Sequence, residues 1–209
     1  MSDLSNADHS ASPPRVHVPR HYNAAHDLIE RNLRAGRAGK AAFIDDSGSC
    51  SYGELARRVD RFASALAGIG LRREDRIVLC LLDTVHWPIA FLGSIKAGVV
   101  PIPVNTSLRP SDYEYMLADS RARALIVSQA LLGSFENLAG KLPALTRVVV
   151  SQAPVVSQAP VVSQAPVGPG AADAGAASAP PTPEGLPGAL DFEALLAQGA
   201  DTFEAVESL

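Results

Sequence analysis

The chain has 209 residues, 47% of them hydrophobic, which allows one large domain or a smaller domain with unstructured flanks. Its 18 basic and 22 acidic residues give a net charge of −4, so the basic excess that nucleic-acid binding requires is missing. There are two cysteines, no secretory signal and no apolar run of the roughly 18 residues that span a bilayer, which predicts a cytoplasmic protein without nucleic-acid or membrane partners.

Residues 1–21 are polar and contain prolines, which predicts a disordered N-terminal arm. From residue 22 to residue 150, strand-like and helix-like segments alternate, which is typical of an α/β subdomain. The first of them are a predicted strand at 41–45 (AAFID) and a predicted turn at 47–50 (SGSC).

Residues 51–70 predict a long helix, because their apolar positions recur at steps of four and three and so share one face. Ser51 and Glu54 have the spacing of a capping box, in which each side chain accepts from the other's backbone N–H. Gly70 stands where a glycine ends a helix.

A continuous apolar run at 76–82 (RIVLCLL) predicts a strand buried on both faces, with Cys80 as a small buried hydrophobe. Asp83 and Thr84 follow as candidate caps of the next helix, 86–98. That helix is apolar nearly all round, so we expect it to lie between other elements rather than on the surface.

The strand predicted at 99–105 contains Pro101 and Pro103, two positions apart. Prolines at this spacing remove backbone donors along the same edge of a strand. We therefore expect either the border of the sheet or a break in the sheet at this strand.

Residues 109–122 predict another helix, with Ser111 and Glu114 as a second capping pair. The remaining segments up to residue 150 are a strand, a short helix and a strand, at 124–128, 129–142 and 145–150. The order of all these elements predicts an α/β fold with a doubly wound, mostly parallel sheet flanked by helices.

Residues 151–189 consist almost wholly of Ala, Pro, Gly, Ser and Val, and VVSQAP occurs three times between residues 149 and 166. Six residues are too few for a repeat unit with its own buried face, so we interpret 151–189 as an extended low-complexity loop. Residues 190–209 contain two short helical patterns and no closing strand, from which we expect a truncated segment of a longer protein.

Three features of the sequence have patterns similar to those of functional sites. Lys40 follows a glycine but lacks the remaining glycine and hydroxyl of a phosphate-binding loop. His17, His21 and His26 are spaced like metal ligands, but Pro19 interrupts them and no cysteine or acidic cluster completes the set.

Four polar or aromatic residues follow the predicted strand 76–82, at the edge where open α/β sheets bind ligands: Asp83, Thr84, His86 and Trp87. Helix capping explains the first two more simply, and His86 and Trp87 remain weak pocket candidates. The residues alone therefore identify no catalytic, cofactor-binding or metal-binding residue.

Three segments resemble the adenylate-forming acyl-CoA synthetases in amino-acid sequence. CSYGELARRVDRFASALAGIG (50–70) is similar to their first core motif, and FLGSIKAGVVPIPVNTSL (91–108) to their second. With DYEYMLADSRARALIVSQALL (112–132), they resemble the benzoate-CoA ligase branch of that superfamily. The resemblance covers roughly residues 22–150 and the tail DTFEAVES (201–208), and it excludes the repeat.

The resemblance implies a ligase that activates benzoate, or a related aryl carboxylate, with ATP to an acyl-AMP such as benzoyl-AMP and transfers the acyl group to coenzyme A, with Mg²⁺ as a further cofactor. The family's phosphate-binding loop and catalytic lysine have no counterpart in these residues, so we expect the chain alone to be inactive. We also expect apolar surface to remain uncovered on it, which predicts marginal stability or self-association.

Two alternatives remain open from the sequence. One is a non-enzymatic α/β interaction module with a disordered Ala/Pro-rich arm. The other is a nucleotide-binding regulator with a Rossmann-like sheet, although no glycine-rich fingerprint follows a strand.

Overall fold

A computed structural model describes residues 4–138, 141–153 and 188–207. Most of the predicted low-complexity loop, residues 154–187, lies outside these described residues. The division of the chain into an arm, an α/β subdomain, a loop and a terminal segment stays a prediction.

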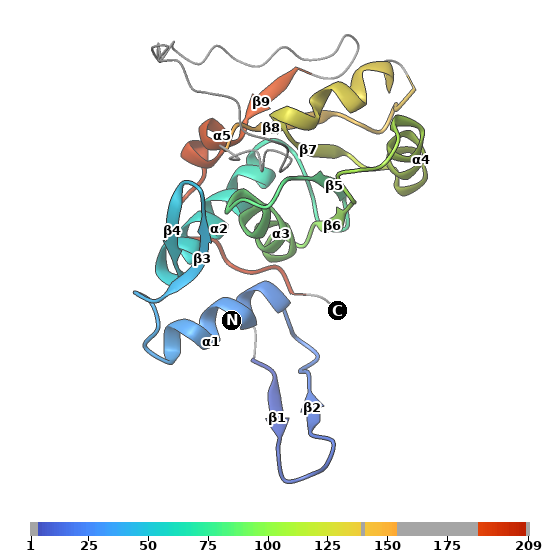
Figure 1. Ribbon diagram of the computed structural model, residues 1–209. Coiled ribbons are helices and arrows are strands. Elements are labelled where there is room, and N and C mark those ends of the chain that lie inside the picture. Colours follow the sequence, from blue (N-terminus) through green and yellow to red (C-terminus); the bar gives the residue numbers. More distant parts are fainter. Residues whose placement is uncertain (1–3, 139–140, 154–187, 208–209) are drawn as a thin grey trace, which may run out of the picture.

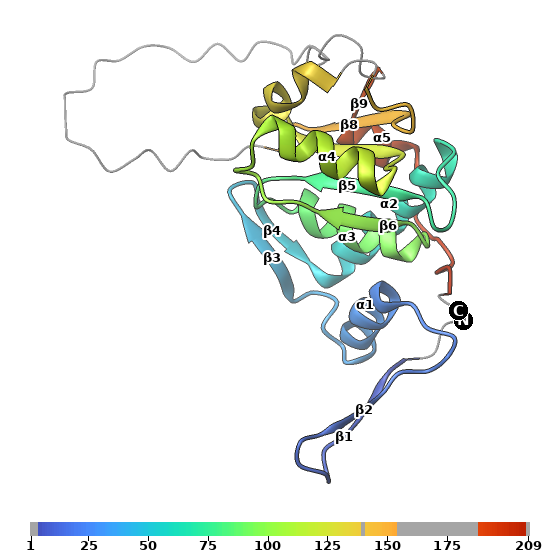
Figure 2. The ribbon, with the colours of Figure 1, turned by 90° about the vertical axis from the view of Figure 1, so that its right-hand side faces the viewer.

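The centre of the fold is a parallel sheet with the strand order β6-β5-β7-β8-β9 (Figures 1 and 2). Every neighbouring pair in it is parallel. Its strands are β5 (Arg76–Cys80), β6 (Val100–Pro103), β7 (Ala124–Ser128), β8 (Arg147–Ser151) and β9 (Ala189–Asp191). The predicted α/β fold is therefore confirmed.

Helices cover both faces of the sheet, as a doubly wound fold requires (Figure 2). One face packs against α2 (Tyr52–Gly68), α3 (His86–Lys96) and α5 (Phe192–Gln198), and α1 (Ala24–Arg34) packs outside α2 and α3. The other face packs against α4 (Pro110–Ser120) and the 3₁₀ helix η1 (Gln129–Leu138). Alternate residues of β8 enter the two cores, Val149 the first and Val148 the second.

Helix α2 begins and ends as the sequence predicts. Ser51 and Glu54 form both bonds of the capping box, and Gly70 has a φ of +89°, a conformation that favours glycine. The predicted apolar face is buried, with Val59 and Phe62 fully inaccessible.

The prediction for the segment at 41–51 is wrong in two respects. Most of the turn predicted at 47–50 is strand, since the turn comes earlier, at 46–47. Residues 41–45 form β3 (Ala41–Asp45), but this strand pairs antiparallel with β4 (Gly48–Ser51) outside the parallel sheet. Phe43 and Ile44 are exposed by 41% and 78%, so the strand lacks the two buried faces of a parallel-sheet strand. The fifth strand of the sheet is instead β9, which lies beyond the repeat.

The edge position of β6 confirms the interpretation of its prolines. The N–H groups of Val100 and Val104 donate to the carbonyls of Asp75 and Leu79, so even-numbered residues face β5. Pro101 and Pro103 stand at the outward-facing positions, where no partner strand needs a donor.

Helix α4 is capped differently from the prediction. The backbone N–H of Arg109 donates to Asp112 Oδ2 at 3.2 Å, because Pro110 is the first helical residue and moves the cap to position 109. The predicted pair, Ser111 and Glu114, already lies within the helix.

The N-terminal residues contain a small antiparallel hairpin, β1 (Asn6–Asp8) with β2 (Arg15–His17), whose residues are exposed. Next to it, the buried carboxylate of Asp27 in α1 accepts hydrogen bonds from Ser5, Tyr22 and Arg31. Burial alone would raise the pKa of Asp27, but these bonds outweigh it and lower the pKa.

After α5 the chain runs along α2 toward α1 without a further helix up to residue 207, contrary to the second helical pattern expected there (Figure 1). None of the helices within the described ranges is both long and apolar enough to span a bilayer.

Candidate functional site

The carboxyl edge of the sheet is the candidate ligand position. From β5 the chain passes to β6 on one side, while β7 lies on the other side, so the strand order reverses there. A cavity of about 310 Å³ opens at this edge beyond β5, β7 and β8. Ser128 and Ser151 line it, and the Leu82 N–H donates to Ser128 Oγ at 3.0 Å.

The predicted caps of α3 do not form. The cap position is Val85, whose N–H donates to Asp45 Oδ2 of β3 at 2.8 Å. Thr84 Oγ1 is buried without a hydrogen-bond partner, and Asp83 is exposed. A carboxylate 40 residues away in sequence thus replaces the local cap.

His86 is buried at the centre of a polar cluster. Its Nδ1 lies 2.8 Å from Ser151 Oγ, and its Nε2 lies 2.7 Å from Glu193 Oε1 of α5. Because an ionised carboxylate only accepts, Nε2 bears the proton and donates. Hydrogen bonding from His86 and the charge of Arg58 lower the pKa of Glu193. The imidazole also stacks on Phe192, with ring centroids 4.2 Å apart.

Serine, histidine and glutamate in this order resemble the hydrogen-bond chain of a serine hydrolase. The burial of the serine and the histidine points to a structural role instead, since Ser151 is 2% and His86 4% exposed, whereas the Glu193 side chain is 59% exposed. The ring is covered by Phe192, and Arg58 binds the same Glu193 oxygen as the imidazole. The cluster connects the end of β8, the start of α3 and helix α5.

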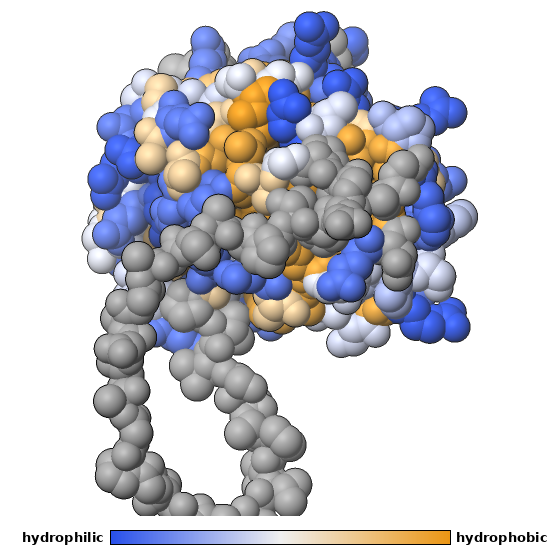
Figure 3. Space-filling model, turned by 90° about the horizontal axis from the view of Figure 1, so that it is seen from above, coloured by the Kyte–Doolittle hydropathy of each residue, from blue (hydrophilic) through white to orange (hydrophobic). Residues whose placement is uncertain are grey.

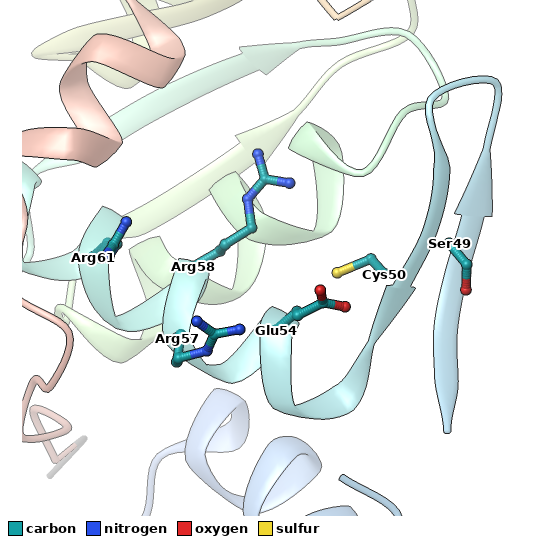
Figure 4. Close-up of a pocket in the computed structure, with 6 residues that line it drawn as sticks. All are labelled: Ser49, Cys50, Glu54, Arg57, Arg58 and Arg61. Carbon is teal, nitrogen blue, oxygen red and sulfur yellow. The ribbon is translucent and has the colours of Figure 1, made fainter. Parts of the chain in front are cut away.

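A second cavity of about 230 Å³ lies between β4 and α2 (Figure 4). Its lining includes three arginines that follow one another along α2: Arg57, Arg58 and Arg61. Arg58 and Arg61 already bind the carboxylates of Glu193 and Asp201. Burial raises the pKa of the Cys50 thiol, so at neutral pH it is not the thiolate that a nucleophile requires.

Lys96 belongs to the segment 91–108, which resembles the second core motif, and it has a structural role. Its ammonium group forms an ion pair with Asp60 of α2, and both side chains are largely buried. Its carbonyl accepts from the Val206 N–H at 2.9 Å. The lysine thus connects α3 to α2 and to the end of the described chain.

The other candidates that the sequence offered, Lys40 and the three histidines, do not form a common site. Lys40 is in the turn between α1 and β3, as predicted for a turn residue. His17 lies on β2, His26 lies in α1, and His21 Nδ1 lies 2.8 Å from Glu207 Oε2. Among the residues that the structure describes, no three His, Cys, Asp or Glu side chains are placed to hold a metal ion.

The sequence identified His86 as a weak candidate but missed its partners. Ser151 and Glu193 are 65 and 107 residues away, one at the end of a strand and one on a short helix. No local pattern connects such positions; only the unpredicted pairing of β9 with β8 brings them together.

Comparison with known proteins identifies relatives of one kind. The profile of the AMP-binding enzyme family matches residues 29–186. A benzoate–CoA ligase of Thauera aromatica is 55% identical over 152 residues, which is 72% of this chain and 29% of the relative. A 4-hydroxybenzoate–CoA/benzoate–CoA ligase of Rhodopseudomonas palustris is 48% identical over 136 residues, 65% of this chain and 25% of the relative.

Comparison with solved structures also identifies CoA ligases of aryl carboxylates. A benzoate CoA ligase from Burkholderia xenovorans LB400 superposes with a TM-score of 0.63 at 38% identity, over 88% of this chain and 30% of that one. An anthranilate CoA ligase in complex with anthranoyl-AMP gives a TM-score of 0.70 at 30% identity, over 91% and 30%. This chain thus spans less than a third of the length of these relatives. It belongs to the AMP-binding enzyme family.

Proposed function

We propose that this chain forms the N-terminal part of an aryl-CoA ligase that activates benzoate. The observation that supports this most directly is the 55% identity with the Thauera benzoate–CoA ligase over 72% of the chain. A second ligase whose name includes benzoate follows at 48% identity, while a long-chain-fatty-acid–CoA ligase of Escherichia coli is only 27% identical.

The proposed reaction has two steps. The benzoate carboxylate attacks the α-phosphorus of ATP and pyrophosphate leaves, giving benzoyl-AMP. The thiol of coenzyme A then attacks the acyl carbon and AMP leaves, giving benzoyl-CoA. Mg²⁺ would neutralise charge on the phosphates, but the described residues contain no cluster of metal ligands.

The described residues contribute scaffold to this reaction rather than chemistry. Charge on phosphoryl oxygens needs preorganised backbone donors or free cations. Two of the three arginines at the α2 cavity are already paired with carboxylates, and Lys96 with Asp60. We therefore expect the 209 residues alone to release no pyrophosphate from ATP with benzoate.

A chimera tests the proposal. The matched 152-residue segment of the Thauera enzyme is replaced by the corresponding segment of this chain, and benzoyl-CoA and pyrophosphate are measured with benzoate, ATP, Mg²⁺ and coenzyme A. We expect benzoate-dependent turnover by the chimera. The unmodified Thauera enzyme and the present chain alone are the positive and negative controls.

Two results would contradict the proposal in separate ways. A chimera that melts cooperatively but forms no benzoyl-CoA would show that this chain is not a ligase segment, and would favour a non-enzymatic interaction module. Turnover by the 209 residues alone would overturn their assignment as scaffold.

The proposal includes a cytoplasmic location, no membrane partner and no nucleic-acid partner, and the net charge of −4 supports the last of these. It also includes self-association of the isolated chain. Apolar side chains gather in the middle of the face seen in Figure 3, and several large hydrophobic side chains elsewhere are exposed, among them Val16, Leu28 and Ile44. Light scattering that finds a monomer at all concentrations would contradict the self-association.

A further inference from the structure

The last described stretch of the chain, residues 189–207, lies across the rest of the fold. Figures 1 and 2 show it as the red segment that passes from β9 through α5 and then along α2 toward α1. We call residues 189–207 the docking segment and the remaining described residues the body. In sequence, residues 152–188 separate β9 from β8, which it pairs with in parallel.

Apolar contacts hold the first half of the docking segment. Phe192, Leu195 and Leu196 are exposed by 0%, 1% and 3%, so the core of the body covers them almost completely. Phe192 stacks between His86 and Phe62, with ring centroids 4.2 and 5.2 Å away. Side chains buried to this extent belong to the core of the fold.

Polar contacts also hold the first half of the docking segment, and they fix its orientation on the body. Glu193 accepts from His86 Nε2 at 2.7 Å and pairs with Arg58. Asp191 caps α5 by accepting from the Ala194 N–H at 2.8 Å. The buried imidazole therefore fixes where α5 begins on the body.

The second half of the docking segment is fixed along its backbone. The Ala200 N–H donates to Ser64 Oγ at 3.1 Å, and the Val206 N–H donates to the Lys96 carbonyl at 2.9 Å. Asn23 Nδ2 donates to the Val206 carbonyl at 2.8 Å. A Cβ at Gly199 would lie 1.9 Å from the Arg61 carbonyl oxygen, so the backbone touches α2 directly there.

We propose that the docking segment is held to the body by these contacts, together with the β8–β9 pairing and the Arg61–Asp201 ion pair, so that it stays bound when the covalent connection through residues 152–188 is cut, and that His86 with Glu193 is its principal polar contact. The surface formed by α2, α3 and the end of β8 is then a binding surface for a peptide with the chemistry of the docking segment. Such a peptide has a buried aromatic residue followed by a carboxylate, and a glycine where it touches α2.

The test uses the full chain with a site for a sequence-specific protease inserted after Gly170. After cutting, the protein is passed over a size-exclusion column under native conditions, and each fraction is analysed by mass spectrometry. We expect both pieces in one peak with an unchanged circular dichroism spectrum. Separate elution of the smaller piece, or unfolding on cutting, would overturn the proposal.

Exchange against excess synthetic peptide 188–209 then measures the release rate of the smaller piece. In cut His86→Phe, which keeps an aromatic ring on Phe192, and in cut Glu193→Gln, we expect release about tenfold faster or more. His17→Ala, an exposed histidine on β2, is the matched control and should leave the rate unchanged. If His86→Phe and Glu193→Gln both release at the wild-type rate, the assignment of His86 with Glu193 as principal contact is wrong.

Discussion

Gly93 lies where α3 crosses α2, and replacing it with alanine tests how closely the two helices pack. A Cβ at this position would lie 2.8 and 3.0 Å from Cδ1 and Cβ of Phe62, and 3.2 Å from the Val59 carbonyl oxygen. Phe62 is completely buried and the Val59 oxygen belongs to the backbone, so neither neighbour moves easily.

The expected effect is the difference of two opposing contributions. Forcing a methyl group into a close-packed contact costs about 1–3 kcal/mol, and the short distances place this site in the upper part of that range. Alanine in place of glycine within a helix stabilises the helix by about 1 kcal/mol. We therefore expect Gly93→Ala to lower the free energy of unfolding by about 1–2 kcal/mol, which corresponds to roughly 2–8 °C in Tm for a chain of this length.

Urea denaturation followed by circular dichroism measures this, with Gly68→Ala as the matched control. Gly68 is also helical but exposed, and a Cβ added there would have nothing within 4 Å, so alanine at this position should stabilise by about 0.5 kcal/mol. If Gly93→Ala is as stable as Gly68→Ala, the helices are not in the contact described.

Four further predictions concern other parts of the fold. Thr84→Val should be neutral or stabilise by up to about 1 kcal/mol, because the hydroxyl is buried without a partner; Asp45→Asn, which weakens the acceptor for the Val85 N–H, should destabilise by about 1 kcal/mol. If urea titrations show that Thr84→Val is destabilising, the threonine does cap the helix and this reasoning is wrong. Since the folded pKa of Asp27 is lowered, its stabilising contribution is present at neutral pH and declines as the pH falls below about 4 toward the folded pKa, so the stability lost in Asp27→Asn should be larger at pH 7 than in acid. The double variant Pro101→Val with Pro103→Val should keep the fold but aggregate faster in light scattering, and unchanged aggregation would show that the prolines do not protect that edge.

The sequence predicted those elements whose determinants are local. The capping box at Ser51, the period of α2 and the glycine at position 70 lie within one helix, and all are confirmed. The buried runs of β5 and β7 were recognisable because parallel strands are apolar on both faces.

The errors arose where distant residues decide the outcome. The pattern of β3 does not reveal that it pairs with β4 instead of entering the sheet, and the three residues of β9 are too few to show any period. Likewise, Thr84 and Asp83 have the composition of caps, but Asp45 occupies that position from another element. The cluster around His86 depends on the same distant pairing and could not be derived from spacing.

The prolines of β6 have a consequence for how the sheet can be extended. An added strand needs a row of donors and acceptors along the border it joins, and Pro101 and Pro103 deny it the donors on the β6 side. At the opposite border, the three residues of β9 (ALD) include no proline. Any polypeptide that widens this sheet beside β6 must therefore do so without those two backbone hydrogen bonds.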